Sequence, residues 1–323
     1  MAELKHRTVL ANGIRIHLVE AGAGPLVLMV HGFPESWYSW RHRVHALADA
    51  GYHAVAIDVR GYGRSSSPAA IDEYRMMKHV GDNLGIVEVL GESHAIIFGH
   101  DWGAPIAANS ALLRPDVFHA LALLSVPYSP RGKRRPSEAF RLMGGKEEFY
   151  IEYFQQPGRA ESEIEPDVRG WLLGFYYSAS GDAPPLKEGT SMATIPPGGK
   201  MRDRLTVPEK LPAWLTAEDL SYYVDEFERT GLTGGLNRYR NVDRDWEDLA
   251  AFMGQPIVVP SFFIGGEKDG PTRWGSTAIA NFNKTLPELR GSHILRGCGH
   301  WVQQERPREV NQLLVKFLDE LEK

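Results

Sequence analysis

The chain is poor in cysteine, since Cys298 is the only one among its 323 residues. A single thiol cannot close a disulfide within the chain, which excludes the small disulfide-stabilised folds of secreted proteins. The first residues also lack the apolar run that a secretory signal requires. We therefore expect a cytoplasmic protein whose stability comes from a hydrophobic core.

Long apolar runs and an excess of one charge are absent as well. Runs such as residues 25–30 and 95–98 are far shorter than the roughly 20 residues that cross a bilayer, so we expect no membrane partner. Lys and Arg number 36 against 41 Asp and Glu, which leaves a net charge of -5 and no basic footprint for nucleic acid. No spacing of histidines is typical of a metal site, and no cofactor is expected.

Short apolar or β-branched runs alternate with helical patterns in the first third of the chain, which predicts an α/β fold with helices packed on a sheet. The predicted strands are residues 7–11, 14–20, 26–31, 53–58, 95–100 and 120–125, and the predicted helices are residues 36–50, 74–90 and 102–113. The later strands show no polar alternation, which is typical of strands that are buried on both faces.

A different pattern follows residue 127, where proline, glycine and charge become frequent. Helical segments are expected at 147–156, 168–178 and 217–230 with no strands among them, and Thr216 with Asp219 forms a near capping box for the last. Residues 181–210 are expected to form a long loop. Strands resume at 257–264 and 292–295, and an amphipathic helix ends the chain. These patterns predict a core of residues 1–128 and 250–323, interrupted by a helical lid domain at 129–249.

The most informative motif is Gly99-His100-Asp101-Trp102-Gly103, which follows an apolar strand and opens a helix. It is the pattern of a nucleophile elbow with Asp at its centre, in which small residues permit a tight turn that exposes the central side chain. The helix N-terminus favours an anion there. The alternative interpretation of Asp101 is an ordinary helix N-cap.

An acid and then a histidine follow Asp101 in the chain. The order nucleophile, acid, histidine is the one found in folds that have a nucleophile elbow. Asp269 lies after one late strand, with Glu267 as the second choice, and His300 lies in a glycine-flanked loop after the next strand. The other position for the acid, after the strand that ends near Ser125, holds no carboxylate. We interpret His300 as a general base that Asp269 orients.

The motif His31-Gly32-Phe33-Pro34 follows the third strand, where this fold places one amide of its oxyanion hole. The residue after the nucleophile supplies the other amide. The backbone N–H groups of Phe33 and Trp102 are therefore the candidates. The simpler alternative is that Gly and Pro only end the strand.

These motifs resemble those of epoxide hydrolases of the α/β-hydrolase superfamily. The resemblance rests on residues 31–41 (HGFPESWYSWR), 58–65 (DVRGYGRS), 99–103, 153–158, 234–241 and 299–307, and so spans nearly the whole chain. It implies a mostly parallel central sheet flanked by helices with an inserted helical lid. It also implies an Asp nucleophile, an Asp–His pair that activates water, and two lid tyrosines that hold the epoxide oxygen.

Carried over by residue, the resemblance assigns the nucleophile to Asp101, the base to His300, the acid to Asp269 and the second lid tyrosine to Tyr239. The first lid tyrosine is Tyr150, with Tyr153, one helical turn later, as the alternative. The expected partners are a small hydrophobic epoxide and water, and a homodimer is a family-level expectation. Residues 181–210 match the family least.

A carboxylate nucleophile limits the reactions that the site can catalyse. An ester formed on Asp101 by displacement at saturated carbon can be hydrolysed at its own carbonyl, whereas a serine would be left as a stable ether. The nearest alternative is a haloalkane dehalogenase, which shares the Asp nucleophile, commonly has Asn at the position of Phe33 and needs no paired tyrosines. A non-catalytic ligand-binding member of the fold is a further alternative, although a binder has no need of Asp101, Asp269 and His300 together with Tyr239.

Overall fold

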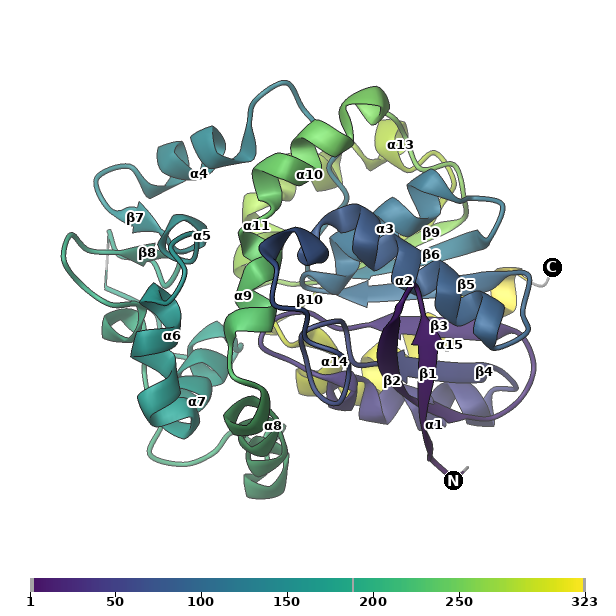
Figure 1. Cartoon of the computed structure of the whole chain (residues 1–323), viewed down its shortest axis with the longest axis horizontal. Helices are drawn as coiled ribbons and strands as arrows, with labels where there is room; N and C mark the ends of the chain where they lie inside the picture. The colour runs from purple at the N-terminus through teal and green to yellow at the C-terminus, as the bar shows by residue number, and fades with distance from the viewer. Residues whose placement is uncertain (1–2, 188, 322–323) are drawn as a thin grey trace.

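An eight-stranded sheet forms the centre of the computed structural model, which describes residues 3–187 and 189–321 (Figure 1). The strand order is β1-β2-β4-β3-β5-β6-β9-β10; β2 pairs antiparallel with β1 and β4, and the other pairs are parallel. The strands are β1 (Lys5–Ala11), β2 (Ile14–Ala21), β3 (Leu26–Val30), β4 (His53–Ile57), β5 (Ala95–His100), β6 (Phe118–Leu124), β9 (Ser261–Gly266) and β10 (Leu289–Leu295). The predicted α/β class with a mostly parallel sheet is confirmed.

Both faces of the sheet are covered, because successive side chains of the central strands β3, β4, β5 and β6 enter different hydrophobic clusters. In β3, Leu28 and Val30 belong to one cluster while Val27 and Met29 belong to the other, and all four are fully buried. This explains the continuous apolar runs in the sequence.

Helices of the sheet region pack on opposite faces. They are α1 (Arg41–Asp49), α2 (Met76–Val89), α3 (Gly103–Leu113), α11 (Gly270–Trp274), α12 (Ser276–Ala280), α13 (Phe282–Thr285), α14 (Val302–Glu305) and α15 (Pro307–Leu321). Residues of α2 and α3 share a cluster with one face, and residues of α1 and α15 share a cluster with the other. The predicted docking of the last helix is confirmed, since Val310, Leu314 and Phe317 are fully buried.

The segment between β6 and β9 forms a group of helices to one side of the sheet (Figure 1). They are α4 (Pro136–Gly144), α5 (Tyr150–Tyr153), α6 (Arg159–Ile164), α7 (Val168–Ala179), α8 (Ala217–Thr230), α9 (Thr233–Tyr239) and α10 (Val242–Asp248). The predicted capping box of Thr216 and Asp219 is confirmed at the start of α8. The exact limits of the lid domain, 129–249, stay a prediction.

Two expectations for this segment were wrong. It does contain strands, because β7 (Glu148–Phe149) pairs antiparallel with β8 (Thr194–Ile195). The helix expected at 147–156 is reduced to α5, because its first residues belong to β7. Strands of two residues are too short to produce a periodic pattern, so the pairing depends on contacts across the chain.

The predicted long loop at 181–210 is mostly irregular and contains β8 and a short 3-10 helix, Met201–Arg204. Besides the pairing of β8 with β7, it is attached near its start and at its 3-10 helix. Near its start the Gly181 amide donates to Glu305 Oε2 (2.9 Å) and Lys268 Nζ donates to the Gly181 carbonyl (2.5 Å). Further on, the Met201 amide donates to Glu163 Oε2 (3.0 Å). The loop is thus fixed at both sides of its central stretch.

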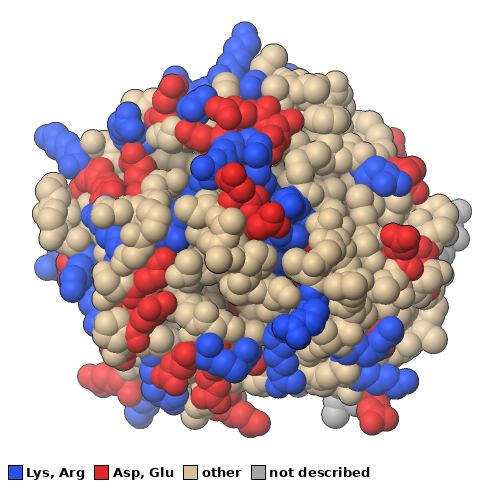
Figure 2. Space-filling view, in the orientation of Figure 1, with Lys and Arg blue, Asp and Glu red and all other residues tan. Residues whose placement is uncertain are grey.

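One face of the molecule carries charges of both signs (Figure 2). Figure 2 shows basic and acidic side chains next to one another on the face in view, separated by uncharged areas. Within residues 3–187 and 189–321, no helix has the length and apolarity needed to cross a membrane.

Candidate active site

The elbow motif forms a tight turn between β5 and α3, and Asp101 at its centre has a positive φ of 49°. The flanking glycines are required by close backbone contacts. A Cβ on Gly103 would lie 1.9 Å from the Val30 carbonyl oxygen, and a Cβ on Gly99 would lie 2.0 Å from the Gly103 carbonyl oxygen. Only glycine fits these two positions. The close backbone packing that glycine permits holds the strained turn in place.

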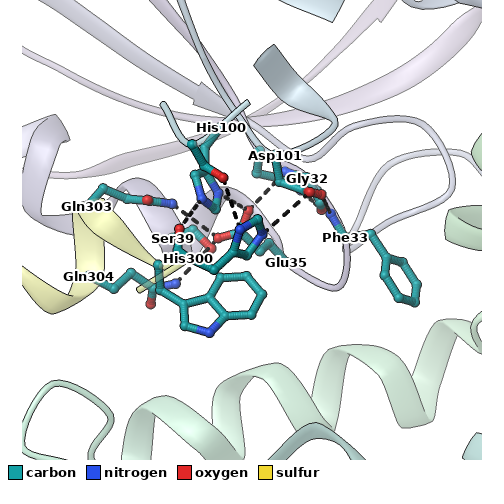
Figure 3. Close-up of polar contacts among 12 residues, drawn as sticks. Gly32, Phe33, Glu35, Ser39, His100, Asp101, His300, Gln303 and Gln304 are labelled. Carbon is teal, nitrogen blue, oxygen red and sulfur yellow. Dashed lines mark hydrogen bonds and ion pairs between the residues drawn. The ribbon is translucent and has the colours of Figure 1, made fainter. Parts of the chain in front are cut away.

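The Asp101 carboxylate does not cap a helix. The N-cap residue of α3 is Trp102, and no side chain caps that helix. Instead, Asp101 Oδ1 accepts a hydrogen bond from the Phe33 amide (2.8 Å), while Oδ2 lies 3.4 Å from His300 Nε2 (Figure 3). The loop before Phe33 approaches so closely that a Cβ on Gly32 would lie 2.2 Å from Asp101 Oδ1. The N-cap interpretation of Asp101 is therefore wrong.

Asp269 and His300 meet beside Asp101. Asp269 follows β9 and is fully buried, and its Oδ1 lies 2.8 Å from His300 Nδ1. Its Oδ2 accepts from the Thr272 amide (3.1 Å) at the start of α11. The second-choice acid, Glu267, is exposed and accepts instead from the Gly297 amide (2.8 Å). Asp101, His300 and Asp269 therefore form one connected chain of polar atoms.

This chain shifts the titration of two of its members. Burial opposes a charge on His300, but the carboxylates of Asp269 and Asp101 outweigh it and raise the pKa of the imidazole well above its usual value. Burial would raise the pKa of Asp269, but His300, Thr272 and Ser125 lower it below its usual value. Asp269 is consequently a carboxylate that stabilises a positive His300.

A buried pair that the sequence did not reveal lies behind these residues. Glu35 Oε2 accepts from the Gly32 amide (3.0 Å) and lies 2.7 Å from His100 Nδ1, and His100 Nε2 contacts the carbonyl oxygen of His300 (2.8 Å). Burial would raise the pKa of Glu35, but His100 lowers it to about 2. Gln303 also donates to Glu35 (3.2 Å). The pair thus connects the Phe33 loop, the elbow and the loop of His300 (Figure 3).

The two lid tyrosines face the same cavity as Asp101 and His300. The cavity has a volume of about 990 Å³, and Tyr150 and Tyr239 line it with ring centroids 6.0 Å apart. Burial raises the pKa of both phenols, and the nearby Asp101 adds to this effect, so both remain protonated hydrogen-bond donors at neutral pH. The alternative residue, Tyr153, is not among the residues lining this cavity, and its hydroxyl donates to Glu163 (2.5 Å).

The wall of the cavity combines aromatic side chains with the long loop. Phe33 and Phe175 contribute rings, and Trp274 adds a third aromatic surface. Much of the remaining wall comes from residues 183–187 and 189–193 of the loop. The Trp102 indole packs edge-on against Tyr239 (5.1 Å between centroids), so it supports the tyrosine from behind. The cavity can enclose an apolar molecule with its polar end at Asp101.

Comparison with known proteins agrees with this arrangement. Residues 25–307 match the α/β hydrolase fold family. Epoxide hydrolases A and B of Mycobacterium tuberculosis are 44% and 42% identical to the chain, over 98% and 97% of it and 98% of each relative. An epoxide hydrolase structure from an endophytic Streptomyces superimposes with a TM-score of 0.97 at 62% identity, covering 99% of this chain and 96% of that one. Epoxide hydrolase A from Mycobacterium thermoresistibile gives 0.92 at 44%, covering 98% of both chains. The chain therefore belongs to the α/β-hydrolase fold family and, within it, to the epoxide hydrolases.

Proposed function

We propose that this protein hydrolyses epoxides to vicinal diols through a covalent ester on Asp101. The observation that carries the proposal is the convergence of three groups on one cavity: the Asp101 carboxylate, the His300–Asp269 pair and the hydroxyl-bearing rings of Tyr150 and Tyr239. A carboxylate supplies the nucleophile, a base can activate water, and two neutral phenols can protonate a leaving oxygen.

In the first step, an Asp101 oxygen attacks an epoxide carbon and forms a C–O bond. The strained ring C–O bond breaks, and its electron pair goes to the ring oxygen. Tyr150 and Tyr239 donate hydrogen bonds to that oxygen, and the proton of one phenol moves to it, which gives the first hydroxyl of the diol and a phenolate. The high pKa of both phenols suits this role, because each ring carries its proton before the epoxide arrives.

In the second step, His300 Nε2 removes a proton from water, and the resulting hydroxide attacks the ester carbonyl of Asp101. The amides of Phe33 and Trp102 hold the oxyanion, where the loss of one such donor typically costs about 10² to 10³ in rate. Collapse of this intermediate breaks the bond between the Asp101 carbonyl carbon and the substrate oxygen, which takes the proton from His300. The diol is released, and the carboxyl proton returns to the phenolate, which restores both the carboxylate and the phenol. Ester formation itself prepares the base, because it removes the Asp101 charge that helps to raise the pKa of His300.

The paired phenols favour an epoxide over an alkyl halide. A halide leaves without a proton, so a site for it has no use for two protonated tyrosines. Here Tyr239 is buried and Tyr150 is partly buried, both line the same cavity as Asp101, and the side chain at the Phe33 position is apolar. The epoxide interpretation therefore ranks above the haloalkane dehalogenase.

A single turnover in ¹⁸O-water tests the proposal. Excess enzyme is mixed with an aryl epoxide, the reaction is stopped after one turnover, and the peptide that contains Asp101 is weighed by mass spectrometry. We expect one ¹⁸O atom in the Asp101 carboxylate, because water attacks the ester carbonyl and not the substrate carbon. Diol that forms while the peptide stays unlabelled would contradict the covalent route, and bromide release from a bromoalkane without epoxide turnover would favour the dehalogenase.

Removing either phenol hydroxyl should slow ester formation. We expect Tyr150→Phe and Tyr239→Phe each to reduce the rate of ester formation by about 10- to 100-fold, the value of a hydrogen bond to a developing charge. Stopped-flow fluorescence under single-turnover conditions measures this step. The control is Tyr153→Phe, whose hydroxyl bonds to Glu163 and should leave ester formation within about threefold of the parent enzyme. A larger effect at Tyr153 than at Tyr150 would reverse the assignment.

A further inference from the structure

Ser125 has an unusual backbone conformation directly after β6. Among the described residues, only Asn12, Asp101 and Ser125 combine a side chain with a positive φ, and the value for Ser125 is 71°. Its side chain is fully buried. L-amino acids with a Cβ rarely adopt this conformation, and it persists where the surrounding structure holds it in place.

The surroundings hold Ser125 from both sides of its peptide. Its amide donates to the Ile264 carbonyl (2.8 Å) on the neighbouring strand β9, and its carbonyl accepts from Thr272 Oγ1 (2.9 Å). These bonds fix where the side chain points. The consequence of the strained backbone is a hydroxyl that lies at the end of β6, the position that this fold can also use for its acid.

That hydroxyl lies between the acid and the base. Ser125 Oγ donates to Asp269 Oδ2 (2.7 Å) and lies 3.0 Å from His300 Nδ1. Because its single proton is given to Asp269, the oxygen meets His300 with a lone pair. The Nδ1–H group of His300 is therefore shared by two acceptors, Asp269 Oδ1 at 2.8 Å and Ser125 Oγ.

We propose that Ser125 is a positioning residue that fixes His300 in its Nδ1–H tautomer once the Asp101 ester has formed, so that Nε2 is the free base that faces the ester. The inference rests on the proposed function. Two acceptors for Nδ1–H disfavour the other tautomer, in which Nδ1 carries a lone pair toward two oxygens. The donation to Asp269 Oδ2 in addition leaves Oδ1 turned toward the ring.

This role is confined to the second chemical step. Ester formation uses Asp101 and the two phenols, whereas His300 acts only when water attacks the ester. Loss of the Ser125 hydroxyl should therefore slow ester hydrolysis and leave ester formation unchanged. A residue that merely supports the fold would alter both steps or the melting temperature alone.

The test uses two variants that lose the hydroxyl and differ in backbone strain, Ser125→Ala and Ser125→Gly. Alanine keeps the Cβ in the positive-φ position, while glycine removes that strain and protects against a failure to fold. Each variant is mixed with an aryl epoxide in a single turnover, and rapid quenching followed by intact-protein mass spectrometry follows the ester over time. We expect hydrolysis of the ester to fall about tenfold in both variants, with ester formation within about twofold of the parent enzyme.

Ser261→Ala is the matched control, because Ser261 is equally buried in the same sheet and its hydroxyl donates to the Val259 carbonyl (2.9 Å). It should leave both steps unchanged. Equal slowing of both steps, an effect in Ser125→Ala but not in Ser125→Gly, or no effect on hydrolysis would each overturn the inference. Failure of the proposed function is distinguishable, since the parent enzyme itself would then form no ester.

Discussion

Replacing His300 by Gln should stop the enzyme after one reaction with an epoxide, with the product skeleton still esterified to Asp101. Ester formation needs the carboxylate and the two phenols, which the substitution leaves in place. Hydrolysis needs a base within reach of water, and an amide cannot take the proton. We expect the rate of ester hydrolysis to fall by a factor of about 10² to 10⁴, which is the usual contribution of a general base.

The measurement is the intact mass of the protein after mixing with an epoxide. It should rise by the mass of one epoxide molecule and remain there, and peptide mapping should locate the adduct at Asp101. His94→Gln is the control, because His94 is an exposed histidine bonded to Ser93, and this variant should turn over like the parent enzyme. Sustained diol production by His300→Gln would show that a different group activates water.

Replacing Asp101 by Ala should abolish both the adduct and the diol. Among the described residues that line the cavity, the other carboxylate is Asp269, which lies behind His300 and whose oxygens already accept hydrogen bonds. The rate with an epoxide should fall to the background reaction with water. Chromatography of the diol and the intact mass of the protein measure the two losses.

The same variant provides an independent readout of the site. Because Asp101 is one of the groups that raise the pKa of His300, that pKa should be lower in Asp101→Ala than in the parent enzyme, as followed by the ring proton signals in NMR. A shift in this direction shows that the protein is folded and that the two side chains interact. Diol formation by Asp101→Ala would indicate that water attacks the epoxide directly.

The sequence was informative where a local pattern carries the information. The apolar strands, the glycines around Asp101 and the order of Asp269 and His300 are all visible within a few residues. Glycine is required at both positions of the motif, because a Cβ at Gly99 or Gly103 would collide with backbone atoms. Such contacts leave a fixed residue type in the sequence.

The type of an element that depends on distant contacts could not be predicted from its local pattern. The helix α9, which carries Tyr239, contains Gly234 and Gly235, two poor helix formers. A tertiary contact requires glycine at the first of these positions, since a Cβ on Gly234 would lie 2.5 Å from the Gly61 carbonyl oxygen. The contacts of Ser125 could not be predicted for the same reason, because its partners Asp269 and His300 follow it by more than 140 residues.

The long loop around the cavity is held in place by groups other than the side chains that line the cavity. Its attachments at Gly181 and Met201 use backbone amides, and the carboxylates that hold them belong to Glu305 and Glu163 outside the loop. Side chains at 183–193 can therefore be exchanged without loss of these attachments. Substitutions in that stretch should therefore change the shape of the cavity wall, while the contacts around Asp101 stay in place.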